Sequence, residues 1–99
     1  MRLSYHPATQ RDVDEILRHY RREGGDALSD RFWHDLMDRL DEISKYPKRF
    51  SPYLRHPNFR RARLRRFPHL IVFRTLNDRI RITVIKHEKR HPAFGMGRE

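Results

Sequence analysis

The clearest candidate for chemistry is a run of arginines near the middle of the chain. Six arginines fall within residues 55–66, with no acidic residue among them. Arg61, Arg63 and Arg65 alternate with apolar residues. On a β-strand they would project from one face about 7 Å apart, close to the spacing of phosphates along an extended nucleic-acid strand. A solvated strand face would show the same alternation, but it would normally mix charge signs. Because guanidinium groups pair well with phosphate and carboxylate oxygens, the run predicts a surface for an anionic partner.

A second candidate is the segment His87-Glu88-Lys89-Arg90-His91, which matches the H-E-x-x-H pattern of zinc metalloproteases. That pattern binds zinc only on a helix, where the two histidines share a face. Here it follows an alternating segment typical of a strand, and Pro92 disfavours a helical His91. In an extended chain the two imidazoles would start about 13 Å apart. We therefore predict no metal site. His87 and His91 are interpreted as groups for acid–base chemistry or phosphate contact.

The basic excess is confined to one half of the chain. The 99 residues carry 23 lysines and arginines against 13 acidic residues, a net charge of +10. Residues 1–49 hold ten basic and ten acidic side chains, whereas residues 50–99 hold thirteen basic and three acidic ones. A strongly basic second half favours an anionic partner: nucleic acid, an acidic protein segment or a membrane surface.

Other features narrow the class of protein. The chain has no cysteine, which excludes disulfides and thiolate metal sites and suits a cytoplasmic location. No apolar run reaches the roughly 18 residues of a membrane-spanning helix, and the first residues do not open a signal peptide. A glycine-rich phosphate loop and a nucleophilic serine motif are also absent. We expect a single cytoplasmic domain, residues 1–99, with no cofactor, no metal and no membrane partner.

The first half of the chain has the pattern of helices. A short strand at residues 3–6 precedes a helix whose apolar stripe ends shortly before Gly24-Gly25. That first stripe consists of Val13, Ile16, Leu17 and Tyr20. A second helix begins near Asp26 or Ser29 and ends before Pro47. Its apolar positions are Leu28, Phe32, Leu36, Leu40 and Ile43, with Trp33 and Met37 widening the stripe. Two amphipathic helices joined by a Gly-Gly turn predict an antiparallel hairpin.

The second half changes to the period of β-strands. Residues 47–58 contain three prolines and are expected to form a loop. Residues 60–66 and 80–84 alternate apolar with polar side chains, and the apolar run at 70–73 is typical of a central strand buried on both faces. Short connections between these segments predict a meander. The expected fold is α+β, with an N-terminal strand and a helical hairpin packed on a small antiparallel sheet, in the order strand, helix, helix and three strands.

Several segments together resemble the RelE/ParE toxin superfamily. They are Leu28-Ser29-Asp30-Arg31-Phe32-Trp33, Arg65-Arg66-Phe67-Pro68-His69-Leu70-Ile71-Val72-Phe73-Arg74, Asn77-Asp78-Arg79-Ile80, Val84-Ile85-Lys86-His87 and Arg90-His91-Pro92. Their order and spacing cover nearly the whole chain. The resemblance implies a type II toxin–antitoxin toxin, of the kind also called plasmid stabilisation proteins. It further implies a compact α+β domain that is neutralised when the C-terminal segment of an antitoxin wraps around it.

The resemblance leaves two targets open. RelE-like toxins cut mRNA in the ribosomal A site, whereas ParE-like toxins poison DNA gyrase. In the ribonuclease branch cations stabilise the charged phosphorane, and Arg61, Arg63 and Arg90 stand at three of its basic positions. Two further positions depart from it, because Leu70 replaces an arginine and Met96 stands about where a tyrosine is expected. These departures favour the ParE-like branch.

Our leading hypothesis is a ParE-like toxin that inhibits DNA gyrase, is not itself an enzyme, and is neutralised by the acidic C-terminal segment of a cognate antitoxin. The residues expected to bind the target or the antitoxin are Arg60, Arg61, Arg63, Arg65, Arg74, Arg81 and Arg90. The alternative is a RelE-like, metal-independent, ribosome-dependent mRNA endoribonuclease. Its catalytic residues would be Arg61, Arg63, Arg90, His87 and His91. A second alternative is a nucleic-acid-binding module without toxic activity.

Overall fold

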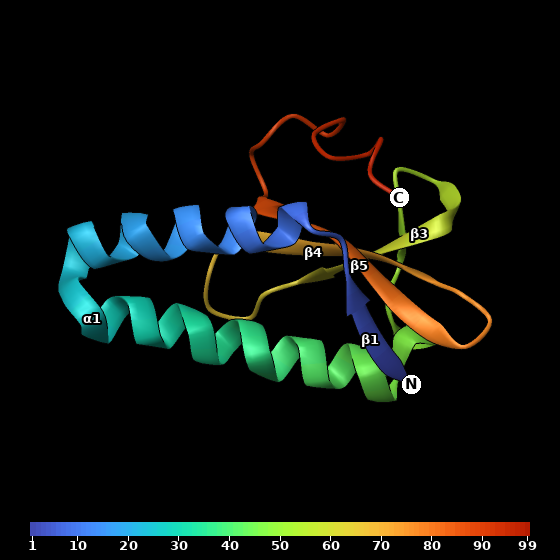
Figure 1. The fold of residues 1–99 in the computed structure, drawn as a ribbon, viewed down its shortest axis with the longest axis horizontal. Helices are drawn as coiled ribbons and strands as arrows, with labels where there is room; N and C mark the ends of the chain where they lie inside the picture. The colour runs from blue at the N-terminus through green and yellow to red at the C-terminus, as the bar shows by residue number, and fades with distance from the viewer.

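The computed structural model describes residues 1–99 and begins with a long helical hairpin. The helix α1 (Ala8–Lys45) is interrupted at Gly24 and Gly25, whose backbone angles are not helical. Gly25 has a φ of 71°, a left-handed conformation that glycine adopts without the steric cost of a Cβ. The chain reverses there, so the first arm of α1 (residues 8–23) and its second arm (residues 26–45) run antiparallel side by side, as predicted (Figure 1). None of the helices combines the length and apolar character that a membrane crossing requires.

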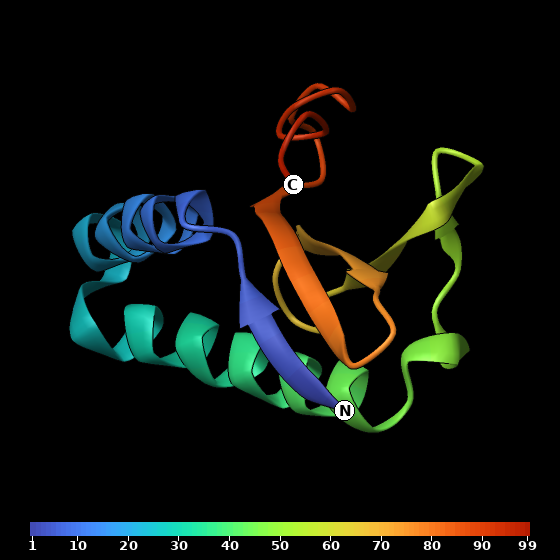
Figure 2. The ribbon, with the colours of Figure 1, turned by 45° about the vertical axis from the view of Figure 1, so that its right-hand side comes forward.

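The sheet has five strands in the order β1-β5-β4-β3-β2. The strands are β1 (Arg2–Tyr5), β2 (Pro52–Tyr53), β3 (His56–Arg63), β4 (His69–Thr75) and β5 (Arg79–His87). The last three form the expected antiparallel meander, whereas β1 pairs parallel to β5 and makes the sheet mixed. Figure 2 shows the hairpin lying against one side of this sheet. The predicted α+β fold, with an N-terminal strand and a helical hairpin on a sheet, is confirmed.

The main core lies between the hairpin and the sheet. The second arm contributes the predicted stripe of Phe32, Leu36, Leu40 and Ile43, all buried. The residues that the sheet contributes to the same core are Ala62, Ile71, Phe73, Ile80, Ile82 and Ile85. Burying one large aliphatic or aromatic side chain stabilises a fold by about 1.5–3 kcal/mol, so this layer holds the hairpin on the sheet. We call this side of the sheet the helix face.

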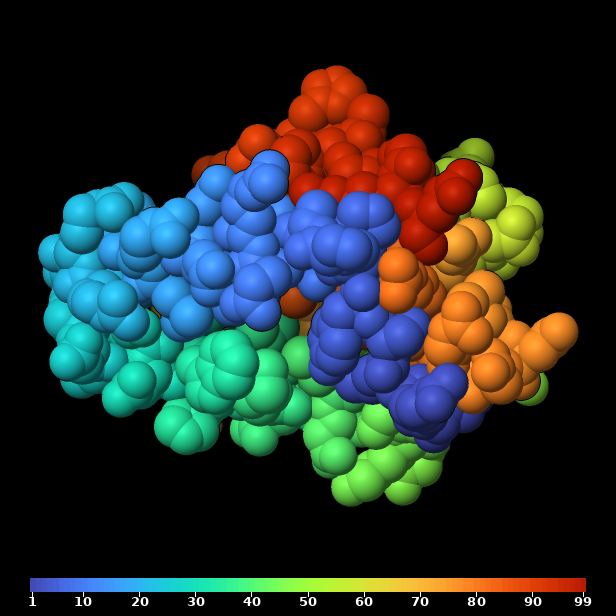
Figure 3. Space-filling view, in the orientation of Figure 1, coloured from blue at the N-terminus to red at the C-terminus, as the bar shows by residue number.

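The opposite side of the sheet is covered by residues 89–99, which we call the strap. The strap contains turns but neither helix nor strand, and it lies beside the first arm of α1 (Figures 1 and 3). Phe94 and Met96 of the strap pack against a second apolar cluster. The members of that cluster are Tyr53, Phe59, Leu70, Val72 and Val84. We call this side the strap face. The strand β4 is therefore buried on both faces, as its continuous apolar run predicts.

Two expectations for the middle of the chain are wrong. The expected loop at 47–58 contains the 3₁₀-helix η1 (Pro47–Arg49), the short β2 and the start of β3. The ladder between β3 and β4 ends at the pair Arg63↔Leu70, because the chain must turn before it enters β4. Arg65 lies in that connection and does not share a strand face with Arg61 and Arg63.

Candidate functional site

The register of the sheet decides which basic side chains share a face. Arg61 pairs with Val72 and Arg63 with Leu70, and both apolar partners belong to the strap-face cluster. Side chains of paired residues point to the same side of a sheet, so both arginines lie on the strap face. Further cations on this face are Arg74, Arg81 and Lys86, which all donate hydrogen bonds to main-chain oxygens of the strap. The sheet is thus apolar on its helix face, whereas its strap face carries these cations together with the second apolar cluster.

Most of the predicted binding arginines already have partners within the fold. Arg60 donates to the Phe50 carbonyl, and Arg63 forms an ion pair of 3.0 Å with Glu88. Arg74 and Arg81 both donate to the main-chain oxygen of Glu99, at 2.8 and 3.3 Å. Arg61 is exposed and has no such partner. The run of arginines is therefore divided between structural contacts and a few free cations.

Another predicted arginine, Arg65, is tied to the second arm of α1. Its guanidinium pairs with one oxygen of Glu42, and the other oxygen of Glu42 pairs with Arg39. Arg39 also donates from Nε to the Arg63 carbonyl at 2.8 Å. These contacts cover the end of β3, so another chain cannot add to the sheet there without displacing Arg39.

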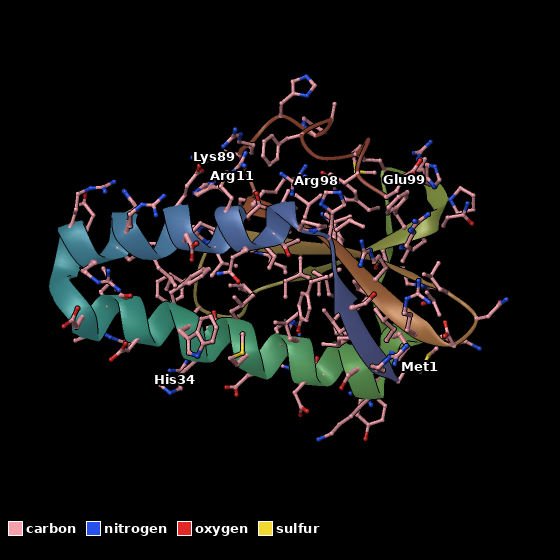
Figure 4. The ribbon with its side chains drawn as sticks, in the orientation of Figure 1. Met1, Arg11, His34, Lys89, Arg98 and Glu99 are labelled. Atoms are coloured by element: carbon pink, nitrogen blue, oxygen red, sulfur yellow. The ribbon has the colours of Figure 1, made fainter.

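The strap begins with three consecutive exposed basic side chains, Lys89, Arg90 and His91, which we call the basic turn. None of them forms an ion pair with a carboxylate. The Arg90 guanidinium lies 3.9 Å above the centre of the Phe94 ring, and Nδ1 of His91 accepts a hydrogen bond from the Ala93 N–H. In Figure 4, Lys89 lies on the same side of the molecule as Arg11 of the first arm. The basic turn and Arg61 are therefore exposed cations without a carboxylate partner.

His87 does not join the arginines. It pairs with His69 across β4 and β5, and the two rings pack at 5.2 Å between centroids on the helix face. His69 is 3% exposed, and its ring also contacts Phe32 and Tyr20. Burial, with smaller contributions from the charges of His87 and His19, lowers the pKa of His69 to about 4. The five residues predicted as catalytic are therefore split between the two faces. No group of three histidine or acidic side chains could hold a metal ion.

An apolar groove of about 420 Å³ lies where the second arm of α1 meets β1. Trp33 and Met37 line it from the second arm, Val13 from the first arm and Tyr5 from β1. Trp33 is 42% exposed and Tyr5 is 47% exposed. Trp33 widens the apolar stripe at the surface, because its ring lines the groove instead of filling the interior. Exposed aromatic rings in a concave site are typical of a surface that another segment covers.

Comparisons with known proteins agree with this architecture. Residues 3–92 match the family described as the ParE toxin of the type II toxin–antitoxin system parDE. The chain belongs to the ParE toxin family. A solved structure, described as the chromosomal ParDE TA system from P. aeruginosa, is 22% identical, with a TM-score of 0.78, 88% of this chain covered and 95% of that chain covered. At that identity the likeness shows the shared fold. No curated protein gave a significant match.

In this ParE-family chain the two positions that depart from the ribonuclease pattern lie close together in the fold. Leu70 is 5% exposed on β4, and Met96 of the strap packs against the same apolar cluster. Sequence reasoning did not anticipate that the strap would bring them together, since residues 89–99 show no period. It also missed Asp12, Lys86 and Arg98, which hold the strap in place. A buried acid on the first arm and a basic residue at the last strand were visible as residue types, but nothing in their spacing indicated contact.

Proposed function

We propose that this ParE-family toxin acts by binding and inhibiting DNA gyrase, catalyses no reaction of its own, and is neutralised by a cognate antitoxin. The observation that carries the proposal is the packing of Leu70 and Met96. Where a ribonuclease of the superfamily would need an arginine and a tyrosine facing RNA, this chain has two apolar side chains packed in one cluster.

The placement of the titratable groups supports binding over RNA cleavage. Cleavage by attack of a 2′-hydroxyl needs an acid–base group and cations around the same phosphate. Here His87 lies on the helix face against His69, while Arg61 and Arg63 lie on the strap face. The Arg63 guanidinium is also neutralised by Glu88 at 3.0 Å.

The basic turn and Arg61 are the proposed contacts for the target. They are exposed, they carry no carboxylate partner, and they stand on the half of the chain that holds the whole positive excess. A cationic surface of this kind attracts an acidic protein surface or the DNA held by gyrase, and the attraction weakens as salt rises. The other predicted contacts would first have to leave partners in the fold; they are Arg60, Arg63, Arg65, Arg74 and Arg81.

The proposed antitoxin is a partner with an acidic, amphipathic C-terminal segment. Its acidic residues would pair with the free cations, and its apolar residues would fill the groove beside Trp33 and Tyr5. Such a segment would remove exposed aromatic surface from water, which is the term that gives most tight interfaces their affinity.

The experiment is a pair of assays on the same purified toxin. DNA supercoiling by gyrase and mRNA integrity on translating ribosomes are measured over one range of toxin concentrations, each with and without the co-encoded antitoxin. Inhibited supercoiling with intact mRNA, reversed by antitoxin, is the expected result. Codon-positioned mRNA cleavage with gyrase unaffected would instead identify the ribonuclease. If neither activity is seen but the protein slows the migration of single-stranded or duplex nucleic acid in a gel, the alternative of a nucleic-acid-binding module without toxic activity holds.

A further inference from the structure

The strap is fastened to the first arm of α1 by one buried ion pair. Arg98 approaches Asp12 with both terminal nitrogens, at 2.6 and 3.1 Å, and the side chains of the pair are 16% and 6% exposed. Arg98 also donates to the Thr83 carbonyl, while Asp12 accepts the Ile85 N–H at 3.1 Å. The carboxylate of Asp12 therefore joins the hairpin, β5 and the strap at one point. Two-pronged contacts of this kind define a single geometry.

A second cation, Lys86, lies beneath the strap and fixes the position of the strap backbone. Lys86 is 3% exposed, and its ammonium donates to the carbonyls of His91, Pro92 and Phe94 at 3.1–3.5 Å. No carboxylate pairs with it, so the strap backbone supplies all its hydrogen-bond acceptors. A buried ammonium is unfavourable without such partners, and closing the strap is what provides them.

The pair with Asp12 is mechanically linked to the basic turn through one aromatic ring. Two guanidinium groups lie close to the Phe94 ring, that of Arg98 at 5.1 Å and that of Arg90 at 3.9 Å from its centre. Phe94 in turn packs on the strap-face cluster. Arg98 thus fixes the strap, the strap fixes Phe94, and Phe94 supports the Arg90 side chain at the surface.

We propose that Arg98 is a positioning residue of the toxin, which through Asp12 holds the strap closed and so presents Arg90 and the basic turn to the target. The inference rests on the proposed function for its target, but closure of the strap is a property of the toxin alone. Asp12 and Arg98 need touch neither gyrase nor antitoxin. Arg98 and Lys86 act together, since the ammonium under the strap keeps its carbonyl partners only while the strap is closed.

The test separates positioning from stability with two variants. In Arg98→Met the Asp12 carboxylate stays buried and loses its charged partner, so both thermal stability and strap closure fall. In the double variant Asp12→Asn with Arg98→Met the unpaired Asp12 charge is removed as well, so stability rises above that of Arg98→Met while the strap remains unfastened. Arg22→Met, an exposed arginine of the same arm with no ion pair, is the matched control.

Three readouts are compared across these proteins: the melting temperature, hydrogen exchange of the strap amides, and the concentration that inhibits gyrase. The informative amides are those of Phe94, Met96 and Arg98, which are hydrogen-bonded within the strap. We expect the double variant to exchange these amides faster and to need about tenfold more toxin for inhibition, as loss of an interface anchor does. Its melting temperature should lie above that of Arg98→Met, whereas the Arg22→Met control should match the wild type in all three readouts.

Two results would overturn the inference. If the strap amides of Arg98→Met and of the double variant stay as protected as in the wild type, Arg98 does not hold the strap. If the strap opens in the double variant but inhibition is unchanged, its closure does not position the target contacts. Should the wild-type toxin leave gyrase unaffected, the proposed function fails, and the exchange measurement alone decides whether Arg98 holds the strap closed.

Discussion

The imidazole rings of His69 and His87 pack against each other at 5.2 Å, one from the start of β4 and one from the end of β5. The His69 ring also packs against Phe32 and Tyr20, and its Nδ1 has no hydrogen-bond partner. Protonation of His69 would place a positive charge in a buried, largely apolar site. His69 is therefore held neutral in the fold, and its role is to pack the closed end of the hairpin against the sheet.

The first prediction follows from this neutral histidine. The pKa of His69 is lowered from 6.5 to about 4, so between these pH values the unfolded chain binds a proton that the folded chain does not. The free energy of unfolding should fall as pH decreases through this window, by up to about 3 kcal/mol. Urea unfolding of the wild type and of His69→Phe at pH 7 and pH 4.5 measures the difference.

The matched control for this prediction is His34→Phe on the exposed side of the second arm, where the histidine lies well away from the sheet (Figure 4). We expect this variant to keep the wild-type loss of stability at acid pH, whereas His69→Phe loses part of it. Equal loss in all three proteins would show that carboxylates alone cause the acid sensitivity.

Local sequence patterns predicted the elements of this fold. The contacts between residues far apart in the chain became known only from the structure. The hairpin followed from apolar residues at helical spacing on both sides of Gly24-Gly25, because that period reflects one buried face. The meander followed from alternation around a wholly apolar run at 70–73. The parallel pairing of β1 with β5 was not predicted, since nothing within residues 2–5 specifies the direction of a distant partner.

The candidate site was predicted less well, for a physical reason. Alternation places Arg61 and Arg63 on one face, but it does not show which arginines will find a carboxylate or a carbonyl in the fold. Glu88 and Glu42 take up two of the predicted cations only because β5 and the second arm end beside the connection from β3 to β4. The ion pair between Asp12 and Arg98 joins residues near opposite ends of the chain, and no local sequence pattern predicts it.

The second prediction contrasts two neighbouring arginines of β3. Arg60 donates to the Phe50 carbonyl, so Arg60→Met should lower the free energy of unfolding by about 1–2 kcal/mol. Arg61 is exposed without a partner, so Arg61→Met should change it by less than about 0.5 kcal/mol. Urea unfolding compares the two. Affinity for the antitoxin, titrated at low and high salt, should fall more for Arg61→Met than for Arg60→Met. Identical behaviour of the two variants in the unfolding and binding assays would contradict the assignment of Arg60 to the fold and Arg61 to the partner.

The third prediction concerns the apolar groove. Trp33 is 42% exposed in the free toxin, so part of its surface is already buried, and Trp33→Ala should lower the free energy of unfolding by about 2 kcal/mol. If the antitoxin fills the groove, the same change should weaken binding by about 2 kcal/mol or more, as removal of a buried aromatic anchor does. Calorimetric titration of the antitoxin measures this. His34→Ala, the next residue along the arm, should bind normally. Unchanged affinity of Trp33→Ala would place the antitoxin elsewhere.

The fourth prediction compares two glycines of the strap. Gly95 has a φ of +76°, and a Cβ there would lie 2.6 Å from a methyl group of Val84, whereas a Cβ at Gly97 would meet nothing within 4 Å. Gly95→Ala therefore combines left-handed strain with a clash against β5, and it should destabilise the protein by about 1–3 kcal/mol. Gly97→Ala should be close to neutral.

Adding Val84→Ala to Gly95→Ala removes the clash but not the backbone strain, and it opens space in the strap-face cluster. The double variant should therefore fail to regain wild-type stability, while its strap should exchange amide hydrogens more slowly than that of Gly95→Ala alone. Equal stability of the two glycine variants in urea would mean that the strap does not rest on Val84 in solution.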